Sequence, residues 1–445
     1  MSKRIVVLGG AESGTGAAVL AKLQGFDVFL SDMSNIAPAF INTLNDYGIA
    51  FEQGQHTADL ICNATEIIKS PGIPNKAPII QQIIALQIPI ISEIEFASRY
   101  TNAKMIAITG TNGKTTTTLL TYHLLKNAGL NVGLAGNVGN SFAMQVATKK
   151  FDYYVLELSS FMLDDMFDFK ADIAILTNIT PDHLDRYDYQ MQKYVNSKFR
   201  ITQNQTASDY FIYCKDDEVI QAALASQQID STMIPFSIAE DLAYGASISN
   251  QHLNIKLKQN TFTMTIQELA LQGKHNLYNS MASGVAAKLL DIRNETLKES
   301  MSDFKNAPHR LEHVARIQGI EFINDSKATN VNATWFALES INTPIIWIAG
   351  GVDKGNDYSM LTQLVKDRVR AIVCLGTDNS KIHEAFGNVV DIIVNTASAT
   401  EAAEVSYHLG KKGDTVLLSP ACASFDLFKS YEDRGNQFKQ AVRSL

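Results

Sequence analysis

The chain has 445 residues and a formal net charge of −8, with 46% hydrophobic and 19% charged residues. This composition supplies enough apolar material for about three domains of roughly 150 residues each, and it excludes a disordered chain or a disulfide-stapled miniprotein. The negative net charge excludes a general electrostatic attraction for nucleic acid or an anionic membrane, so an anionic substrate would need local donors or metal ions.

The first elements predict a parallel sheet. An apolar run at 5–8 stops at Gly9, which predicts a first strand and not a signal peptide. A helix at 17–23 and a strand at 27–30 follow, and we interpret the apolar triplet 60–62 as a further strand. Polar residues interrupt the apolar stretch 79–94, so we expect no membrane span. The four cysteines are scattered without metal spacing, which suits a reducing cytosol.

Two more series of alternating strands and helices follow. The second has strands at 105–109, 153–158, 173–177 and 210–213, and the third has strands at 345–348, 371–375, 392–394 and 415–418. Between them, polar and apolar residues alternate over 247–266, which predicts an antiparallel hairpin. We place the domain boundaries near residue 100 and near residue 305, where a helix ends before Pro308.

A turn at 9–16 (GGAESGTG) follows the first strand, and Asp32 ends the next one. This arrangement is typical of a dinucleotide fingerprint, although its glycine spacing does not fit G-x-G-x-x-G. The helix N-terminus suits a diphosphate, and a purely structural tight turn is the alternative. The alternative hypothesis of an NAD(P)-dependent oxidoreductase is supported by this turn alone.

The segment GTNGKTT, between a strand and a helix, predicts a nucleoside triphosphate site. Its glycines let backbone N–H groups surround a phosphate, Lys114 neutralises charge, and Thr115 can hold Mg²⁺. Ile108 stands where the full GxxxxGK[ST] pattern has its first glycine, and the alternative is a glycine-rich turn with an incidental lysine. The strand, lysine, paired threonines and helix together favour the phosphate loop.

Three further residues follow predicted strands of the second series. Glu157 ends a strand, where a carboxylate can hold Mg²⁺, and the alternative is a capping or turn residue. His183 lies in a polar turn (NITPDHLD), where a metal or substrate role competes with a structural one. Lys198 lies on the next helix, where a solvated lysine is the simpler interpretation.

Four polar segments occur where an apolar core would be expected: 273–279, 324–330, 350–355 and 419–426. The first places two amides three residues apart on a helix, and the others follow strands. Any one of them is compatible with an ordinary loop or helix cap. Together they predict an active site at a domain interface.

The segments GTNGKTT, ELSSF, NITPDHLDRY, GKHNLYN, PHR, NDSKATN, GGVDKG and LSPACASFDLF occur in this order, and through them the whole chain resembles the Mur ligases. The resemblance implies an α/β fold of three domains. These are a Rossmann-like UDP-substrate domain (1–100), a central P-loop ATPase-type parallel sheet with an added antiparallel hairpin (101–305), and a Rossmann-like amino-acid-binding domain (306–445).

The implied reaction is the ATP-dependent addition of D-glutamate to UDP-N-acetylmuramoyl-L-alanine through an acyl phosphate, in cytoplasmic peptidoglycan precursor synthesis. The alternative enzyme is another Mur-type ligase or a folylpolyglutamate-synthase-like ligase, and no DNPR-type motif of the diamino-acid-adding relative occurs. A nucleotide-binding regulator without turnover would keep the phosphate loop but has no reason to keep His183 and Lys198 together.

The resemblance also implies roles for individual residues. It implies catalytic roles for Lys114, His183 and Lys198. It implies ATP binding by Gly110, Thr111, Asn112, Gly113, Lys114, Thr115, Thr116, Asn276, Asn279, Arg310 and Asp325. It implies binding of the UDP substrate by Glu12, Ser13, Asp32, Met33, Ser34, Ser70, Pro71, Gly72, Asn137 and His183. It implies D-glutamate binding by Lys327, Thr329, Lys354, Ser424 and Tyr431, and two Mg²⁺ ions at Thr115, Glu157, His183 and a carbamylated Lys198.

Two positions depart from the family's pattern. Relatives can carry a basic residue at Ser34, and Tyr431 replaces a phenylalanine. We expect a monomer that has small-molecule substrates and no nucleic-acid partner.

Overall fold

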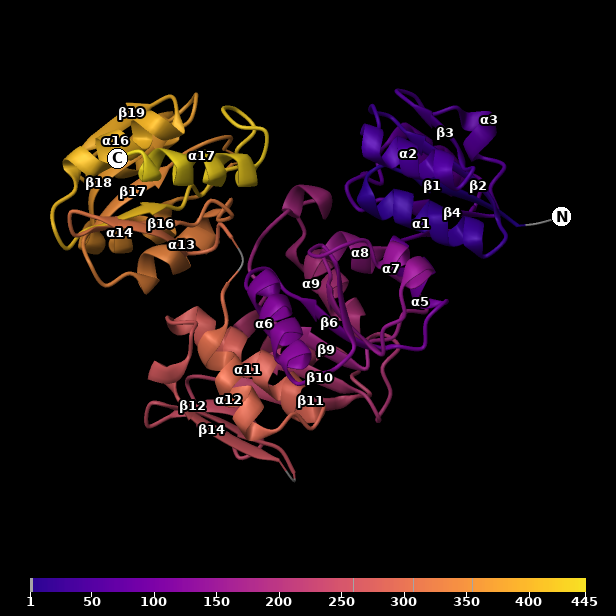
Figure 1. Ribbon diagram of the computed structural model, residues 1–445, viewed down its shortest axis with the longest axis horizontal. Coiled ribbons are helices and arrows are strands. Elements are labelled where there is room, and N and C mark those ends of the chain that lie inside the picture. The colour runs from indigo at the N-terminus through magenta and orange to yellow at the C-terminus, as the bar shows by residue number, and fades with distance from the viewer. Residues whose placement is uncertain (1–2, 259, 307, 354) are drawn as a thin grey trace. The chain divides into compact units, whose positions relative to one another are not determined.

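The computed structural model describes residues 3–258, 260–306, 308–353 and 355–445 (Figure 1). The chain folds into two compact units, one formed by Met1–Ala270 with Leu277–Phe304 and the other by Leu271–Asn276 with Lys305–Leu445. The first unit contains two sheets and the second contains one. The fold is therefore α/β, as the alternating pattern predicts.

The first sheet is parallel throughout, in the order β3-β2-β1-β4-β5. Its strands are β1 (Arg4–Leu8), β2 (Asp27–Asp32), β3 (Ala50–Gln53), β4 (Glu66–Lys69) and β5 (Ile90–Ile91). The helices of this part are α1 (Glu12–Leu23), α2 (Pro38–Asp46), α3 (Ala58–Ile61), α4 (Pro78–Ala85) and α5 (Glu93–Ser98). Helices α3 and α4 share a core cluster with β1 and β4, in which Val6, Leu8 and Ile67 are fully buried.

The prediction of a strand at 60–62 is wrong, because these residues belong to α3 and to the turn that ends it. Thr57 precedes this short helix, and its backbone N–H and hydroxyl both donate to Glu52. Ile61 is then buried in the core below β1, while the fourth strand is β4. A triplet of apolar residues is too short to distinguish a helical turn from a strand.

The second sheet has nine strands in the order β14-β13-β12-β11-β10-β9-β6-β8-β7. Its parallel strands are β6 (Lys104–Thr109), β7 (Val132–Gly136), β8 (Tyr153–Glu157), β9 (Ile173–Leu176), β10 (Tyr210–Cys214), β11 (Thr232–Ser237) and β12 (Gly245–Ser249). Two antiparallel strands, β13 (His252–Lys256) and β14 (Thr261–Thr265), extend the sheet. The antiparallel hairpin is thus present, and β12 pairs with it as a third strand through a turn at Asn250 and Gln251, whose φ angles are +50° and +60°.

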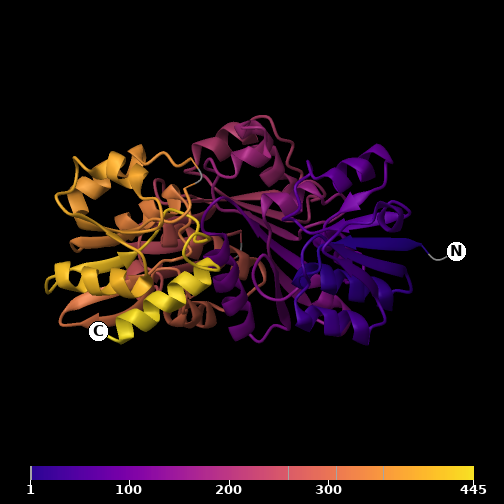
Figure 2. The same cartoon turned by 90° about the horizontal axis from the view of Figure 1, so that it is seen from above.

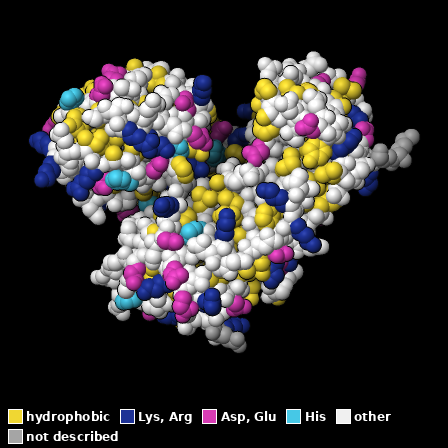
Figure 3. Space-filling view, viewed as in Figure 1, with side chains coloured by type: hydrophobic (Ala, Val, Ile, Leu, Met, Phe, Trp, Pro, Cys, Tyr) yellow, Lys and Arg dark blue, Asp and Glu magenta, His cyan; other side chains and the backbone are white. Residues whose placement is uncertain are grey.

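The helices of this part are α6 (Lys114–Asn127), α7 (Phe142–Thr148), α8 (Ser160–Asp164), α9 (Met191–Phe199), α10 (Glu218–Leu224), α11 (Lys274–Leu289) and α12 (Asn294–Asp303). Helix α7 packs against α1 of the first sheet, within the same unit. On the face shown in Figure 3, basic and acidic side chains are interspersed, in keeping with the modest net charge. No helix in the described part of the chain is long and apolar enough to cross a membrane.

The third sheet has the order β15-β16-β20-β17-β18-β19 and is parallel except for β15. Its strands are β15 (Glu312–Ile317), β16 (Ile320–Asn324), β17 (Ile345–Ala349), β18 (Val369–Leu375), β19 (Ile393–Thr396) and β20 (Thr415–Leu418). Its helices are α13 (Val331–Ser340), α14 (Thr362–Arg368), α15 (Ser380–Phe386), α16 (Ala399–Leu409) and α17 (Tyr431–Arg443).

The helices of the third sheet cover both of its faces (Figures 1 and 2). Along β17, Ile345 and Trp347 face the cluster formed with α13, α14 and α15. Ile346 and Ile348 face the cluster formed with α16 and α17. Burial on both faces explains why the strand is an uninterrupted apolar run.

Candidate active site

The loop between β6 and α6 has the backbone of a phosphate-binding loop. Gly110 has φ +145°, and a Cβ at this residue would lie 1.9 Å from the hydroxyl of Thr177, so a side chain does not fit there. Gly113 precedes the first turn of α6 with φ +80°. The N–H groups of Thr111 and Asn112 donate to the carbonyl and side-chain oxygens of Asn178, which fixes the loop to the end of β9.

Lys114 opens helix α6 and folds back over this loop. Its Nζ donates to the carbonyls of Gly110 and Thr111, at 2.8 Å each. Thr115 and Thr116 are buried in the first turn of the helix. The loop thus combines backbone N–H groups, a helix N-terminus and a cation, which is the chemistry that binds the phosphates of a nucleotide.

Glu157 ends β8, next to β6 in the sheet, and is 1% exposed. Its Oε1 accepts a hydrogen bond from Asn137 Nδ2 at 2.9 Å, and its backbone carbonyl accepts from Asn137 N. In the described part of the chain, Glu157 Oε2 is buried with no hydrogen-bond partner. A buried carboxylate oxygen without a donor is costly unless a cation pairs with it, so the site fits Mg²⁺.

Lys198 lies below the phosphate loop and is not a solvated lysine, since it is 2% exposed. Its Nζ donates to the carbonyl of Gly110 at 2.7 Å, more weakly to Thr109 Oγ1 at 3.4 Å, and lies 5.1 Å from the centre of the Tyr194 ring. Burial, reinforced by the charge of Lys114, holds the pKa of Lys198 well below its ordinary value.

His183 lies in the turn after β9, with φ +51° and a side chain that is 47% exposed. The centre of its ring lies 5.2 Å from the centre of the Phe161 ring, and the guanidinium of Arg186 lies over the Phe161 ring at 4.4 Å. Arg186 also donates to the carbonyl of Pro71 at 3.4 Å. The predicted substrate residues Pro71 and His183 are therefore brought to one cluster, through Phe161 and Arg186, which the sequence analysis did not select.

The other residues predicted for the UDP substrate lie at the carboxyl edge of the first sheet. Asp32 Oδ2 accepts from Gly10 N at 2.5 Å, and its Oδ1 accepts from Ser34 N at 2.7 Å. A Cβ on Gly9 would lie 2.3 Å from Ser70 Oγ, so the first turn and the loop after β4 are close neighbours. Met33 and Gly72 are exposed, while Ser13 is half-buried.

Glu12 begins helix α1, but it points toward the second sheet. Its Oε1 accepts from Ser141 N at 3.0 Å. Ser141 Oγ donates in turn to Glu93 Oε1 at 2.5 Å, and Ala143 N donates to the same oxygen at 2.9 Å. Burial raises the pKa of Glu93 to about 7. One oxygen of Glu12 is therefore engaged by Ser141, the residue that precedes α7.

The two amides predicted to bind ATP lie on α11. Asn279 accepts from Thr117 Oγ1 at 3.1 Å, and a Cβ on Gly113 would lie 2.4 Å from its Oδ1, so it is a neighbour of the phosphate loop. Asn276 is also buried and donates to the carbonyl of Gln272 at 2.8 Å.

In the second unit, the predicted residues lie at the carboxyl edge of the third sheet. Asp325 is buried, and it accepts from Ser419 Oγ at 2.9 Å and from Leu311 N at 3.2 Å. Burial raises the pKa of Asp325 to about 7, although Arg310 acts in the opposite direction. Lys354 lies outside the described residues.

The remaining residues predicted for D-glutamate adjoin the same strand ends. Lys327 Nζ lies 5.4 Å from the centre of the Tyr431 ring. Thr329 N donates to the carbonyl of Lys327 at 3.0 Å. Ser424 is buried in the loop after β20.

A buried arginine that the sequence analysis missed joins these loops. Arg434, on α17, is fully buried and donates to Ser326 Oγ and the carbonyl of Ser326, at 3.0 and 2.9 Å. It also donates to the carbonyl of Cys422, at 3.2 Å, and at 3.4 Å to that of Gly350. Burial lowers the pKa of Arg434 to about 10, so it remains a cation at neutral pH.

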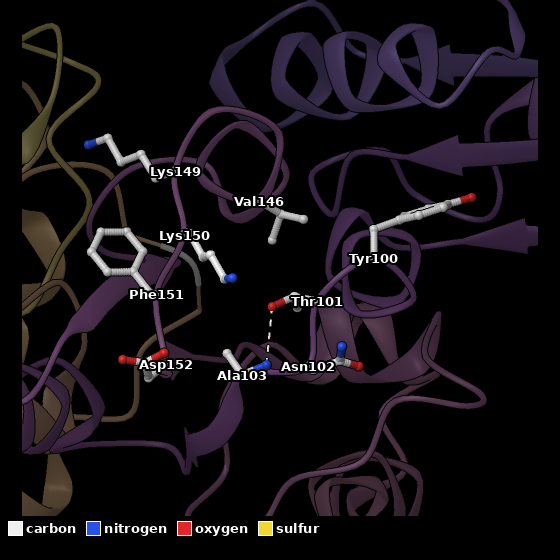
Figure 4. Close-up of a pocket in the computed structure, with 9 residues that line it drawn as sticks. All are labelled: Tyr100, Thr101, Asn102, Ala103, Val146, Lys149, Lys150, Phe151 and Asp152. Carbon is white, nitrogen blue, oxygen red and sulfur yellow. Dashed lines mark hydrogen bonds between the residues drawn. The ribbon is translucent and has the colours of Figure 1, made fainter.

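A separate pocket of about 430 Å³ lies at the opposite edge of the second sheet, beside the starts of β6 and β8 (Figure 4). Ala103 N donates to Thr101 Oγ1 across one wall, and Lys149 points away from the cavity. The pocket contains none of the predicted site residues. Within the described ranges, no group of three or more His, Cys, Asp or Glu side chains is arranged to hold a metal ion.

Comparisons with known protein families match three segments of the chain. Residues 3–92 match the MurD-like N-terminal domain of Mur ligases, 108–287 the Mur ligase middle domain, and 309–422 the Mur ligase glutamate ligase domain.

Curated relatives match over the full length. UDP-N-acetylmuramoylalanine–D-glutamate ligase of Bacteroides fragilis is 56% identical over 444 residues, covering 100% of both chains. The protein of the same name from Bacteroides thetaiotaomicron is 55% identical, again with full coverage of both.

Solved structures resemble the fold at lower identity. UDP-N-acetylmuramate-alanine ligase from Thermotoga maritima matches with a TM-score of 0.63 and 19% identity, covering 100% of both chains. A MurF ligase from the same organism, solved with ADP, matches with a TM-score of 0.62 and 14% identity, covering 94% of this chain and 95% of that one.

Proposed function

The chain belongs to the Mur ligase family, and from this we infer that it catalyses the ATP-dependent addition of D-glutamate to UDP-N-acetylmuramoyl-L-alanine. The observation that carries this function is the phosphate loop, with the buried oxygen of Glu157 and the buried amine of Lys198 at the same edge of the sheet. D-Glutamate is favoured over the other amino acids that the family adds, because the relatives that are 55–56% identical over the full length are D-glutamate ligases.

The reaction needs an activated carboxylate, because a free carboxylate is a poor acyl donor. The alanyl carboxylate attacks the γ-phosphorus of ATP, which gives an acyl phosphate and ADP. The amine of D-glutamate then attacks the acyl carbon, the tetrahedral intermediate releases inorganic phosphate, and the nitrogen loses a proton. Both steps gather negative charge, which the N–H groups of the phosphate loop and Lys114 stabilise.

The Mur ligases use ATP with Mg²⁺, and the residues here fit the ion. Thr115, Glu157, His183 and a carbamylated Lys198 would hold two Mg²⁺ ions. The ions would neutralise phosphate charge when bound. Lys114, from its place on the loop, orients the β- and γ-phosphates for in-line attack.

The carbamate on Lys198 is supported by the environment of its amine. A cationic amine next to two Mg²⁺ ions would repel them, whereas addition of CO₂ to a neutral amine gives an anionic oxygen ligand. Nζ is buried among oxygen acceptors and an aromatic ring, and no ion pair with a described carboxylate holds it. The charge of Lys114 and the burial of the amine both favour the neutral form.

Intact mass measurement with and without bicarbonate tests the carbamate directly. Lys198→Ala should lose turnover and regain part of it when a small carboxylate is added. Full activity of Lys198→Ala without any supplement would rule out the carbamate.

We assign the UDP substrate to 1–100, ATP to 101–305 and D-glutamate to 306–445. Asp32, Ser70 and their neighbours support the first assignment, because they share one sheet edge. Lys327, Ser424 and Tyr431 support the third, because they adjoin the strand ends of the third sheet. We also propose that the enzyme acts as a monomer in the cytoplasm.

Phosphate release tests the function. The full chain is mixed with ATP, Mg²⁺ and UDP-N-acetylmuramoyl-L-alanine, and a panel of D- and L-amino acids is added singly. We expect release above background with D-glutamate alone. Release that depends on a different amino acid would assign the chain to another ligase of the family.

A further inference from the structure

A buried polar network lies where β2 and β3 end. Ser31 is fully buried, and its Oγ lies 2.7 Å from Glu52 Oε1 and 2.7 Å from Nδ1 of His56. Asp32, which is predicted to contact the nucleotide, follows Ser31 directly. The network therefore places the imidazole of His56 at the edge of the predicted nucleotide site.

The loops after these two strands are tied to each other. Gly54 N donates to the carbonyl of Ser34 at 3.3 Å. Ile36 N donates to Gln53 Oε1 at 2.8 Å. The loop that carries His56 is therefore held against the loop that follows β2.

The hydrogen bonds fix which nitrogen of His56 carries the proton. Glu52 also accepts from Thr57 N at 2.8 Å and from Thr57 Oγ1 at 2.6 Å. Although burial acts to raise it, these bonds hold the pKa of Glu52 below its ordinary value, so Glu52 is ionised and can only accept. Ser31 therefore gives its single proton to Glu52 and accepts from Nδ1–H of His56.

The other ring nitrogen is then an acceptor. Burial lowers the pKa of His56, although Glu52 and Asp32 act in the opposite direction, and the neutral ring leaves Nε2 unprotonated. In the described part of the chain, Nε2 has no hydrogen-bond partner, and the side chain is half-buried. Each oxygen of the neighbouring Asp32 already accepts one backbone N–H group, and Nε2 of His56 adds a further acceptor beside this carboxylate.

We propose that Nε2 of His56 accepts a hydrogen bond from the uridine of the substrate, and so helps this site to select the nucleoside. The donor is an N–H or O–H group of the nucleoside, either the uracil imide or the 2′-hydroxyl of the ribose. This inference rests on the proposed function, because it takes the first sheet to bind the UDP part of the substrate.

Two substitutions separate a ligand contact from a structural role. The amide of His56→Asn can still donate to Ser31 from the position of Nδ1, but it leaves nothing at the position of Nε2. His56→Gln reaches the position of Nε2 with its amide oxygen and gives up the bond to Ser31. If His56 only supports the fold through its bond to Ser31, His56→Gln should weaken UDP binding more than His56→Asn does.

Binding of UDP to the full-length variants, measured by calorimetry, is the assay. We expect His56→Asn to bind UDP about threefold to tenfold more weakly than the wild type, as for one lost hydrogen bond, and His56→Gln to be less affected. 3-Methyl-UDP lacks the imide proton and 2′-deoxy-UDP lacks the 2′-hydroxyl, so the two analogues identify the donor. The analogue that lacks the donor should bind the wild type more weakly than UDP does. The same analogue and UDP should bind His56→Asn equally well.

Wild-type affinity for UDP in His56→Asn would overturn the proposal, as would equal binding of UDP and both analogues to the wild type. If the variants do not fold, the ¹⁵N shift of Nε2 in the wild type decides, because it must move on addition of UDP. A wild type that binds no UDP would instead overturn the proposed function, so the two failures are distinguishable.

Discussion

Replacing Arg434 with methionine tests how the strand-end loops of the second unit are held. Methionine fills part of the space of the guanidinium but has no donors, so the buried carbonyls of Ser326 and Cys422 lose their partner. An orphaned buried acceptor costs about 1–3 kcal/mol, and two of them predict a loss of about 2–6 kcal/mol. The opposing effect is relief of the desolvation of the buried cation, which forms no ion pair with a carboxylate in the described residues.

Tryptophan fluorescence is the natural probe for this change, because the only two tryptophans of the chain, Trp335 and Trp347, both lie in the second unit. With a urea m-value of about 2 kcal/mol per M, we expect the unfolding midpoint of Arg434→Met to fall by about 1–3 M. Arg434→Lys keeps the charge but has fewer donors, so its unfolding midpoint should lie between those of Arg434→Met and the wild type. A midpoint of Arg434→Met equal to or above that of the wild type would show that desolvation outweighs the hydrogen bonds.

Three other predictions concern the remaining parts of the site. Lys114→Ala should abolish turnover and leave the circular dichroism unchanged, while Lys126→Ala, on the exposed last turn of the same helix, should keep activity. Ser424→Ala should raise the KM for D-glutamate at least tenfold more than the KM for the UDP substrate, and Ser70→Ala should do the reverse. Burial raises the pKa of Glu93 from 4.5 to about 7, so the folded state binds more protons between these values. The contribution of Glu93 to the free energy of unfolding should then fall as the pH rises through this window, by up to about 3 kcal/mol. In chemical unfolding at pH 5 and 7.5, Glu93→Gln should show a decrease that is smaller by this amount, because the contribution of Asp325 remains.

Each of these expectations has a result that contradicts it. Near-normal ligation by a folded Lys114→Ala protein would show that the loop does not bind the triphosphate. Equal effects of Ser424→Ala on both substrates would refute the separation of domain roles. If the free energy of unfolding changes with pH by the same amount in the wild type and in Glu93→Gln, then Glu93 is ionised over the whole range from pH 5 to 7.5.

The strands and the phosphate loop were predictable because their signals are local. A buried parallel strand is a continuous apolar run, and the loop 110–116 carries its glycines, lysine and threonines within seven residues. The three series of strands match the three sheets for the same reason. The triplet 60–62 shows the limit of such patterns, because its burial against β1 and β4 is the same for a helical turn as for a strand.

The residues that the sequence analysis missed act over long separations. Arg434 lies in a polar stretch (YEDRGNQFKQ) that is typical of a solvated helix, and only the fold reveals that it is buried. Glu93 meets Ser141 across 48 residues, and Arg186 meets Pro71 across 115. His56 depends on Glu52 and Ser31, whose roles follow from the pairing of β2 with β3.

The polar contacts between the first two sheets restrict how freely this chain can be divided or recombined. Glu95 is fully buried, and it accepts the backbone N–H groups of Phe167, Asp168 and Phe169, while Lys69 pairs with Asp165 at 2.8 Å. A fragment cut at residue 100 would expose these groups without their partners. A chimera that takes its first hundred residues from a distant relative must therefore also take the matching segments around 141 and 165–169 from that relative.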